Sequence, residues 1–185
     1  NNIGWSYANI YKYKKAEEYY NKGLKIDKNN LHIINNLANL KKDLDKSDEA
    51  VELYKKILSK QPNAIAAMYN LANLYNTMGE FDKSKQIFFN ILKMNSNLTE
   101  ADRIISQMTT YDKDHSHFIN MKKKLSDTSL NEQALIHLHY ALGKAYSDQK
   151  EYDISFKNFK KANDLSKKIS KYNFQIDKER FSKIK

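Results

Sequence analysis

Hydrophobic and polar residues recur along this chain with a period of thirty-four positions. The run Asn-Leu-Ala-Asn-Leu at 36–40 returns at 70–74, and each copy is followed at matching offsets by a small residue and an aromatic residue. A repeat of this length is typical of a helical hairpin that cannot bury its own apolar face, so neighbouring hairpins must stack. The pattern therefore predicts an all-α solenoid whose extended concave surface holds a partner.

Small and aromatic residues mark the repeat in four places, at about 1–30, 31–64, 65–98 and 136–169. Small residues let helix backbones approach closely, and aromatic side chains fill the gaps between adjacent hairpins. The positions that carry the pattern are Ile3, Gly4, Tyr7, Ala16 and Tyr20; Leu37, Ala38, Ala50, Tyr54 and Pro62; Leu71, Ala72, Tyr75, Ser84 and Phe88; and Leu142, Gly143, Tyr146, Ser155, Phe159 and Ala162. We therefore expect these aromatic side chains in the core.

These positions resemble the tetratricopeptide repeat (TPR), in which a bulky residue, Leu-Gly and an aromatic residue are followed by Ala, Phe, Ala and Pro. The repeat at 31–64 is the cleanest copy and closes with Pro62, and Gly79 stands at the turn of the next copy. The resemblance implies a right-handed stack in which the first helix of each hairpin lines the concave face.

The register fails between 99 and 135. Helical periodicity over 99–110 is followed by a turn at 111–114, a short helix at 116–125 and a second turn at 126–129. The next helix is expected to begin near Leu130 or Asn131, with Ser129 as its N-cap and Glu132 at the third position. Beyond Lys171, apolar residues behind Asp177 predict the start of another helix. We therefore predict one array over 1–170, with 99–135 as an irregular repeat, and a C-terminal helix start or cap over 171–185.

Composition supports a helical, soluble chain. The sequence has four Gly, one Pro and no Cys, which excludes a disulfide framework, a thiolate metal site and a cysteine nucleophile. No apolar run approaches the length of a membrane span, and no export signal is present. We expect a soluble, cytoplasmic, bacterial protein without a membrane partner.

The formal net charge of +10 raises the question of nucleic-acid binding. The excess is divided evenly between the two halves of the chain, and only Arg103 and Arg180 among the 32 basic residues are arginine. A spread surface of lysines lacks the clustered, forked donors that read phosphates and bases. We therefore expect no nucleic-acid partner.

Asparagines repeat in register on the expected first helices. Asn2, Asn36 and Asn70 occupy one equivalent position, and Asn39 and Asn73 form a second row one turn along. An amide both donates and accepts, so such a row can hold the backbone of an extended peptide, as it does in some TPR proteins. The alternative is that asparagine is simply abundant here and satisfies helix ends. The predicted peptide-binding groove consists of Asn35, Asn36, Asn39, Tyr69, Asn70 and Asn73.

Other binding chemistries find little support. A TPR carboxylate clamp fails because Asn35, Glu100 and Ile104 replace or oppose its cationic residues. The histidine pairs 115/117 and 137/139 are each two residues apart and point to opposite sides of a helix, so neither can chelate a metal from one face. We predict no catalytic residue, no metal and no cofactor.

Residues 137–168 carry a more particular resemblance. The segment from His137 through Ala-Leu-Gly-Lys-Ala at 141–145 to Asn163 is similar to the last repeat of bacterial proteins in which TPRs precede a sulfotransferase domain. No segment could form the Gly-containing loop that holds a phosphosulfate donor. Three interpretations stay open: a peptide- or protein-binding scaffold, the non-catalytic arm of such a sulfotransferase, and a module that self-associates through the ends of its stack.

Overall fold

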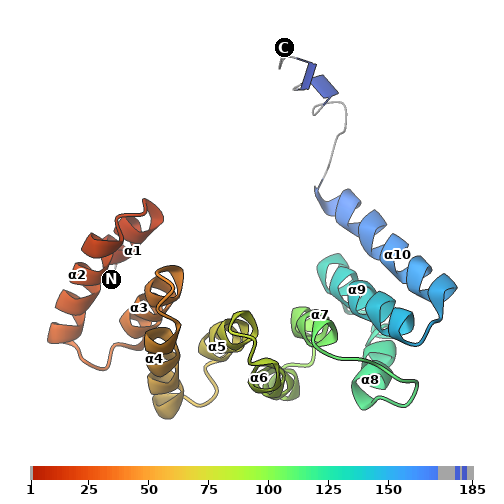
Figure 1. Cartoon of the computed structure of the whole chain (residues 1–185), viewed down its shortest axis with the longest axis horizontal. Helices are drawn as coiled ribbons and strands as arrows, with labels where there is room; N and C mark the ends of the chain where they lie inside the picture. Colours follow the sequence, from red (N-terminus) through yellow and green to blue (C-terminus); the bar gives the residue numbers. More distant parts are fainter. Residues whose placement is uncertain (1, 171–177, 180, 183–185) are drawn as a thin grey trace. The chain divides into compact units, whose positions relative to one another are not determined.

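The structure is a computed structural model that describes residues 2–170, 178–179 and 181–182. Ten α-helices have both ends within these residues, which contain no strand, and the all-α prediction is confirmed (Figure 1). The helices are α1 (Asn2–Asn9), α2 (Tyr13–Ile26), α3 (Leu31–Asp43), α4 (Ser47–Lys60), α5 (Ile65–Thr77), α6 (Phe81–Met94), α7 (Thr99–Gln107), α8 (Ser116–Lys124), α9 (Glu132–Asp148) and α10 (Tyr152–Ser170). They belong to two compact units, Asn1–Ile91 and Leu92–Lys185.

In the first unit the helices pair as the period predicts, α1 with α2 and α3 with α4, and α5 leads into α6. The predicted aromatic residues Tyr20, Tyr54 and Phe88 are buried to 2% exposure or less. Ala38 and Ala50 are also buried completely beside Ile34 and Leu71. The repeat pattern therefore identified these core positions, but the expectation was wrong for the other aromatic residues, since Tyr7, Tyr75, Tyr146 and Phe159 are only half-buried.

Small residues hold helices close together in both units. A Cβ atom on Gly4 would lie 2.6 Å from the ring of Tyr20. Two other repeats carry a serine on the second helix at the position of Ala16 and Ala50, and this serine hydrogen-bonds a carbonyl of the first helix: Ser84 Oγ donates to Ala72 at 2.8 Å, and Ser155 Oγ donates to Gly143 at 2.7 Å. The hydroxyl thus takes the place of a methyl group and ties the two helices together.

Every regular hairpin turns in the same way. Tyr11, Asp45, Gly79 and Lys150 stand at one repeat position, and all have φ between 58° and 79°. The following backbone N–H bonds the carbonyl five residues back, which is the Schellman ending of a helix. These bonds are Lys12 to Tyr7, Lys46 to Lys41 and Glu80 to Tyr75 at 2.9 Å, and Glu151 to Tyr146 at 3.0 Å. Only Gly79 signalled this left-handed turn in the sequence.

The second unit contains the irregular segment. Helix α7 ends at Gln107, and α7, α8 and α10 all contact α9. The core includes Tyr111 and Phe118 with Leu138 and Leu142. The predicted N-cap of α9 was wrong: the helix is capped by Asn131, whose side chain accepts a hydrogen bond from Ala134 N at 2.8 Å. Ser129 stands two residues before this cap and belongs to the preceding turn, where its hydroxyl donates to Asp127.

A buried polar cluster occupies this unit. The carboxylate of Asp102, which has no exposed surface, accepts hydrogen bonds from His117 Nε2 at 2.9 Å and Lys124 Nζ at 2.6 Å. With Nε2 donating, Nδ1 of the same ring accepts from the Tyr111 hydroxyl, 2.7 Å away. Burial raises the pKa of Tyr111, so its hydroxyl stays protonated as a donor. This cluster joins α7 and α8 where the repeat pattern fails.

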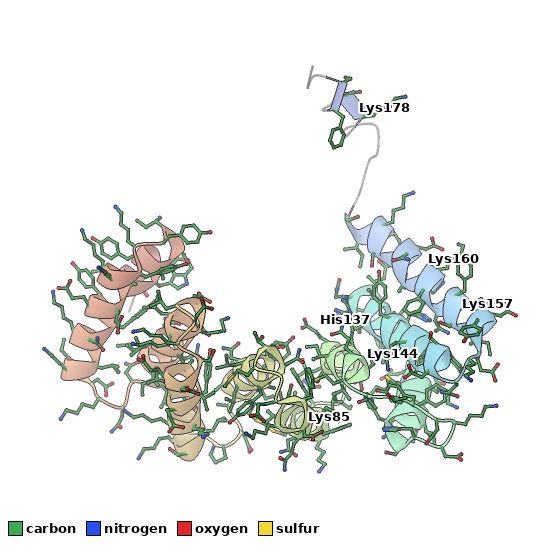
Figure 2. The ribbon with its side chains drawn as sticks, in the orientation of Figure 1. Lys85, His137, Lys144, Lys157, Lys160 and Lys178 are labelled. Atoms are coloured by element: carbon green, nitrogen blue, oxygen red, sulfur yellow. The ribbon has the colours of Figure 1, made fainter. Side chains whose placement is uncertain are left out.

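The basic residues are spread over the helices. Figure 2 labels Lys85 on α6, Lys144 on α9, and Lys157 and Lys160 on α10. None of the described helices is long and apolar enough to cross a membrane. The predicted helix start or cap over 171–185, with Asp177, lies outside the described residues apart from 178–179 and 181–182.

Candidate functional site

The predicted groove residues lie on the first helices of two successive hairpins in the first unit. Asn35, Asn36 and Asn39 belong to α3, and Tyr69, Asn70 and Asn73 belong to α5. All six are half-buried. Helix α3 is positioned by its N-cap: the side chain of Asn30 accepts a hydrogen bond from Ile33 N at 3.1 Å. The asparagines alternate with apolar positions that face the core, and this places them at its edge.

Three of these asparagines come together across the two repeats. Asn70 Nδ2 on α5 donates to Asn39 Oδ1 on α3 at 3.3 Å and to Asn35 Oδ1 at 3.5 Å. Asn39 Oδ1 also accepts a hydrogen bond from the Tyr54 hydroxyl at 2.5 Å. The structure therefore links the second and third repeats through a row of side-chain amides.

The internal bonds use only part of the hydrogen-bonding capacity of the row. Among the described residues, nothing donates to Asn70 Oδ1, and nothing accepts from Nδ2 of Asn39 or Asn35. The row thus keeps one amide acceptor and two amide donors. A peptide unit offers one N–H and one C=O, so the remaining groups are complementary to a polypeptide backbone.

The buried side chain of Tyr54 fixes the orientation of the amide row. The residue is fully buried, and burial raises the pKa of its phenol, with the charge of Asp43 acting in the same direction. The hydroxyl therefore remains protonated and donates to Asn39 throughout the physiological pH range. The sequence identified Tyr54 as a core residue and missed this second role. Its one signal is that Phe88 stands at the equivalent position of the next repeat.

The other predicted residues lie on the same helices but play different parts. The ring of Tyr69 packs edge-on against Phe88, with 5.5 Å between ring centroids. The backbone carbonyl of Asn73 accepts a hydrogen bond from Thr77 Oγ1 at 3.0 Å, and Asn36 is half-buried on α3. Asn2, the first member of the row in the sequence, is exposed on α1.

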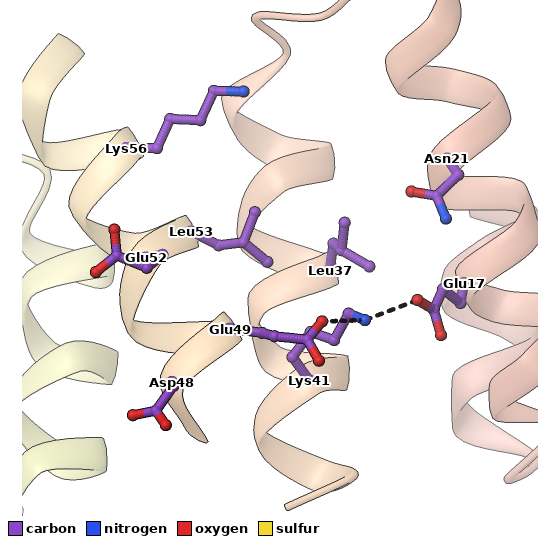
Figure 3. A pocket seen from close by; sticks show the side chains of 9 residues that line it. All are labelled: Glu17, Asn21, Leu37, Lys41, Asp48, Glu49, Glu52, Leu53 and Lys56. Carbon is purple, nitrogen blue, oxygen red and sulfur yellow. Dashed lines mark hydrogen bonds and ion pairs between the residues drawn. The ribbon is translucent and has the colours of Figure 1, made fainter. Parts of the chain in front are cut away.

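A second hollow was not predicted. A groove of about 770 Å³ lies between α2, α3 and α4 (Figure 3). Its lining residues are Glu17, Asn21, Leu37, Lys41, Asp48, Glu49, Glu52, Leu53 and Lys56. At one end of the groove, the ammonium of buried Lys41 lies between two carboxylates, 2.7 Å from Glu17 and 2.5 Å from Glu49.

The charges of this groove stabilise one another. Burial alone would lower the pKa of Lys41, but hydrogen bonds with Glu17 and Glu49 outweigh it and raise the pKa. The bond with Lys41 lowers the pKa of Glu49 in turn. In the described part of the chain, no group of three or more His, Asp or Glu side chains is arranged to hold a metal ion.

Comparisons with known proteins agree with this architecture. Sequence models of the tetratricopeptide repeat match residues 43–108, 1–30 and 136–169, which together make up well over half of the chain. The chain therefore belongs to the tetratricopeptide-repeat family. Its fold and family are those of a protein-interaction scaffold, which confirms the general function expected from the period. No significant relative was found among curated proteins.

Solved structures share the fold. A crystal structure of MamA has a TM-score of 0.70 and 23% identity, with 92% of this chain and 98% of that chain covered. MamA 41-end from Desulfovibrio magneticus RS-1 has a TM-score of 0.69 and 17% identity, with 90% and 93% covered. A protein from Podosopora anserina, described as a kinesin light chain with nearly identical TPR-like repeats, has a TM-score of 0.69 and 13% identity, with 92% and 95% covered. At these identities the likeness concerns the fold alone.

Proposed function

We propose that this scaffold binds an extended polypeptide segment along the first-helix face of α3 and α5. The observation that carries the proposal is the amide row of Asn35, Asn39 and Asn70, which is fixed internally and still presents an acceptor and two donors. Groups held in place before binding lose little conformational freedom on binding, so their hydrogen bonds contribute more to affinity. Asn36, Asn73 and Tyr69 extend the same face.

The chemistry of this face favours binding over catalysis. Five of its six residues are neutral amides, which neither titrate nor act as nucleophiles. No nucleophile and general base are paired among the six, and a reaction would require such a pair. We therefore propose a non-catalytic, cytoplasmic protein that needs no cofactor, with a polypeptide rather than a nucleic acid or a membrane as its partner.

The test begins with a peptide selected from a display library on the intact chain. Its affinity is then measured for the wild type, for the double variant Asn39→Ala with Asn70→Ala, and for Asn90→Ala. Asn90 is an exposed asparagine on α6 outside the row, and it controls for loss of an amide as such. The double variant should bind about thirtyfold more weakly, since it loses two hydrogen bonds to the peptide that are worth roughly 1 kcal/mol each. Equal affinities for all three proteins would remove the amide row from the binding site.

A second candidate is the non-catalytic arm of a bacterial sulfotransferase. It is supported by the resemblance of residues 137–168, which form the α9 and α10 hairpin with Ser155 bonded to Gly143. Sequencing the gene beyond Lys185 tests it. A downstream segment with a phosphosulfate-binding loop would support the arm, and an immediate stop codon would exclude it.

A third candidate is self-association through α1, as expected for a stack that pairs through its ends. Its support is apolar exposure: Ile3 and Trp5 are each 56% exposed on this short helix. Sedimentation of the wild type and of Trp5→Ser over a range of concentrations tests it. A dimer that is weakened by Trp5→Ser would support the proposal, and a monomer at all concentrations would end it.

A further inference from the structure

One position of the repeat differs in chemistry between hairpins. Near the end of the first helix, three of the regular repeats carry a tyrosine, Tyr7, Tyr75 or Tyr146, and the repeat at 31–64 carries Lys41. The tyrosine rings are packed: Tyr7 stacks on Tyr19 with 5.4 Å between centroids, and Tyr146 meets Phe118 edge-on at 5.1 Å. Lys41 is therefore an exception that needs a local explanation.

In two of the three repeats with a tyrosine here, the residue eight positions later is a lysine, and in the third, after Tyr146, it is Ile154. Lys15 and Lys83, eight residues after Tyr7 and Tyr75, place their ammonium groups over those rings at 5.5 and 5.4 Å from the centroids. In the 31–64 repeat, the residue eight positions after Lys41 is Glu49, and the two form an ion pair. A tyrosine–lysine contact has thus been replaced as a unit by a lysine–glutamate contact, and the replacement leaves no ring at this place.

The groove lies beside Lys41, where the other regular repeats carry a tyrosine ring. Its lining combines the apolar side chains of Leu37 and Leu53 with four carboxylates and two ammonium groups (Figure 3). In a chain whose net charge is +10, this is a local excess of negative charge. Among the described residues, the carboxylate of Asp48 has no ion-pair partner, and that of Glu52 pairs with Lys55 alone. Both side chains of the Glu52–Lys55 pair are more than half exposed to solvent.

We propose that the groove between α2, α3 and α4 binds a partner protein through a basic segment that also carries apolar side chains. A lysine or arginine of the partner pairs with Asp48 and Glu52, while a neighbouring apolar side chain packs on Leu37 and Leu53. The site differs from the amide row both in place and in chemistry, because most of its lining residues lie on α4 and because it recognises charge. Lys56 also lines the groove and opposes the binding of cations.

The ion pairs of the groove explain why the ligand is cationic. Lys41 is already neutralised by Glu17 and Glu49, so its charge is not available to an anion such as a phosphate. The exposed carboxylates of Asp48 and Glu52 form no ion pair with Lys41, so they are the groups that an incoming side chain meets. A negative groove on a positive chain also steers cationic ligands to this site, an effect that weakens as salt is added.

The probe is a short fluorescent peptide in which lysines alternate with leucines, titrated against the intact chain at low and at moderate salt. A second peptide replaces the lysines by glutamates, and a third replaces the leucines by serines. The lysine–leucine peptide should bind tightest, because it alone satisfies both the carboxylates and the apolar floor. Equal binding of the glutamate peptide would overturn the proposal.

Two variants separate the groove from general electrostatic attraction. Asp48→Asn with Glu52→Gln should weaken the lysine–leucine peptide about fivefold to tenfold, as expected for two partly solvated ion pairs. The control is Asp82→Asn: Asp82 stands at the position of Asp48 in the next repeat, which carries Tyr75 in place of Lys41, and its loss should leave the affinity unchanged. An equal loss in the control would mean that the peptide responds to net charge alone.

A third variant fills the groove. Lys41→Tyr combined with Glu49→Lys recreates the arrangement of Tyr75 and Lys83, and should abolish peptide binding while circular dichroism shows an intact helical fold. Should this double variant fail to fold, Lys56→Gln keeps the test decisive, since it should tighten binding about twofold to threefold by removing a repulsive charge. Unchanged affinity in a folded, filled variant would overturn the proposal. A self-association of the unlabelled chain that disappears in Asp48→Asn with Glu52→Gln would also overturn it, by assigning the groove to a second copy.

Discussion

The two compact units of this chain both bury apolar side chains between their helices, and the irregular segment of the second unit adds a buried polar cluster. In the first unit, each hairpin repeats the same apolar contact, with Tyr20, Tyr54 or Phe88 buried against the small residues of neighbouring helices. In the second unit, α7 and α8 are joined by hydrogen bonds around the buried carboxylate of Asp102. Apolar contacts lose stability in proportion to the volume removed, whereas a buried polar cluster fails when one member is lost.

This difference indicates which parts of the chain tolerate amino-acid substitution. The contacts of the first unit are interchangeable, because each repeat offers the same kind of core to its neighbour. The first-helix face can therefore vary without loss of the fold, and this freedom is what a binding face requires. The hydrogen bonds of the Asp102 cluster require one arrangement of α7 and α8. We therefore expect the residues of this cluster to determine how the two helices pack.

The largest effect is expected at Asp102. Asp102→Asn removes a buried charge that both His117 and Lys124 contact, and leaves the half-buried ammonium of Lys124 without its carboxylate partner. The free energy of unfolding should fall by about 3–5 kcal/mol, as is typical when one partner of a buried ion pair is lost. Urea denaturation measures the loss, and hydrogen exchange should place it in α7 and α8.

Asp164 provides the control for that variant. It pairs with Lys160 on the surface of α10, where both side chains are more than half exposed. Asp164→Asn should leave the urea midpoint unchanged, because exposed ion pairs contribute little. If Asp102→Asn also left the urea midpoint unchanged, the buried cluster would not be what joins α7 to α8.

Both units contain the left-handed helix turn, so substitutions at its positions test whether the turn affects stability in the same way in each unit. Gly79 has a φ of +79°, and a Cβ added there would meet no atom within 4 Å. Gly79→Ala should therefore cost roughly 1–2 kcal/mol through backbone strain alone. Lys150→Gly relieves the same strain in the second unit and should raise the stability by about 0.5 kcal/mol. A loss of stability in Lys150→Gly, measured by the urea midpoint, would contradict a shared turn.

Removing the Tyr54 hydroxyl tests the support of the amide row. Tyr54→Phe deletes the hydrogen bond to Asn39 and keeps the ring, so the free energy of unfolding should fall by about 1 kcal/mol. Tyr20→Phe is the matched change in the preceding repeat, whose tyrosine donates to no asparagine, and should have a smaller effect. Equal effects of the two variants would show that the bond to Asn39 adds no stability.

The smallest expected effect is the pH dependence of stability that arises from His137 in the second unit. Burial lowers the pKa of His137 below its ordinary value of 6.5, although Glu100 acts in the opposite direction. The unfolded chain therefore takes up a proton at this residue more readily than the folded chain, so stability falls as the pH drops below about 6.5. His137→Gln should lose less stability than the wild type between pH 8 and pH 5 in paired urea titrations. A steeper loss in the variant would show that the folded state favours the charged imidazole.

Much of the fold could be predicted because the repeat fixes which residues face the core. The aromatic and small positions, the helical pairs and the break near residue 99 all follow from hydrophobic periodicity. Helix boundaries followed less closely: Asn131 rather than Ser129 caps α9, because the helix begins at Glu132 and both residues are of a type that can cap a helix. The left-handed turns at Tyr11, Asp45 and Lys150 carry no glycine and gave no signal.

The candidate sites were only partly accessible from the sequence. The period could place asparagines in rows, but the bonds of Asn70 to Asn35 and Asn39 depend on side-chain distances that the period does not contain. The groove depends on a departure from the repeat, Lys41 where a tyrosine is usual, and its ion pair with Glu17 joins residues of neighbouring repeats. The buried pair of His117 and Asp102 likewise depends on tertiary packing of α7 and α8.

The most direct test of the central claim, that the amide row holds a peptide backbone, compares a selected peptide with an analogue in which one amide is replaced by an ester. The ester removes a backbone N–H that would donate to Asn70 Oδ1 and leaves every side chain unchanged. At the position that meets Asn70, the ester should weaken binding to the wild type about fivefold to tenfold, and should weaken binding to Asn70→Ala very little. Equal losses for wild type and Asn70→Ala at every ester position would contradict the account.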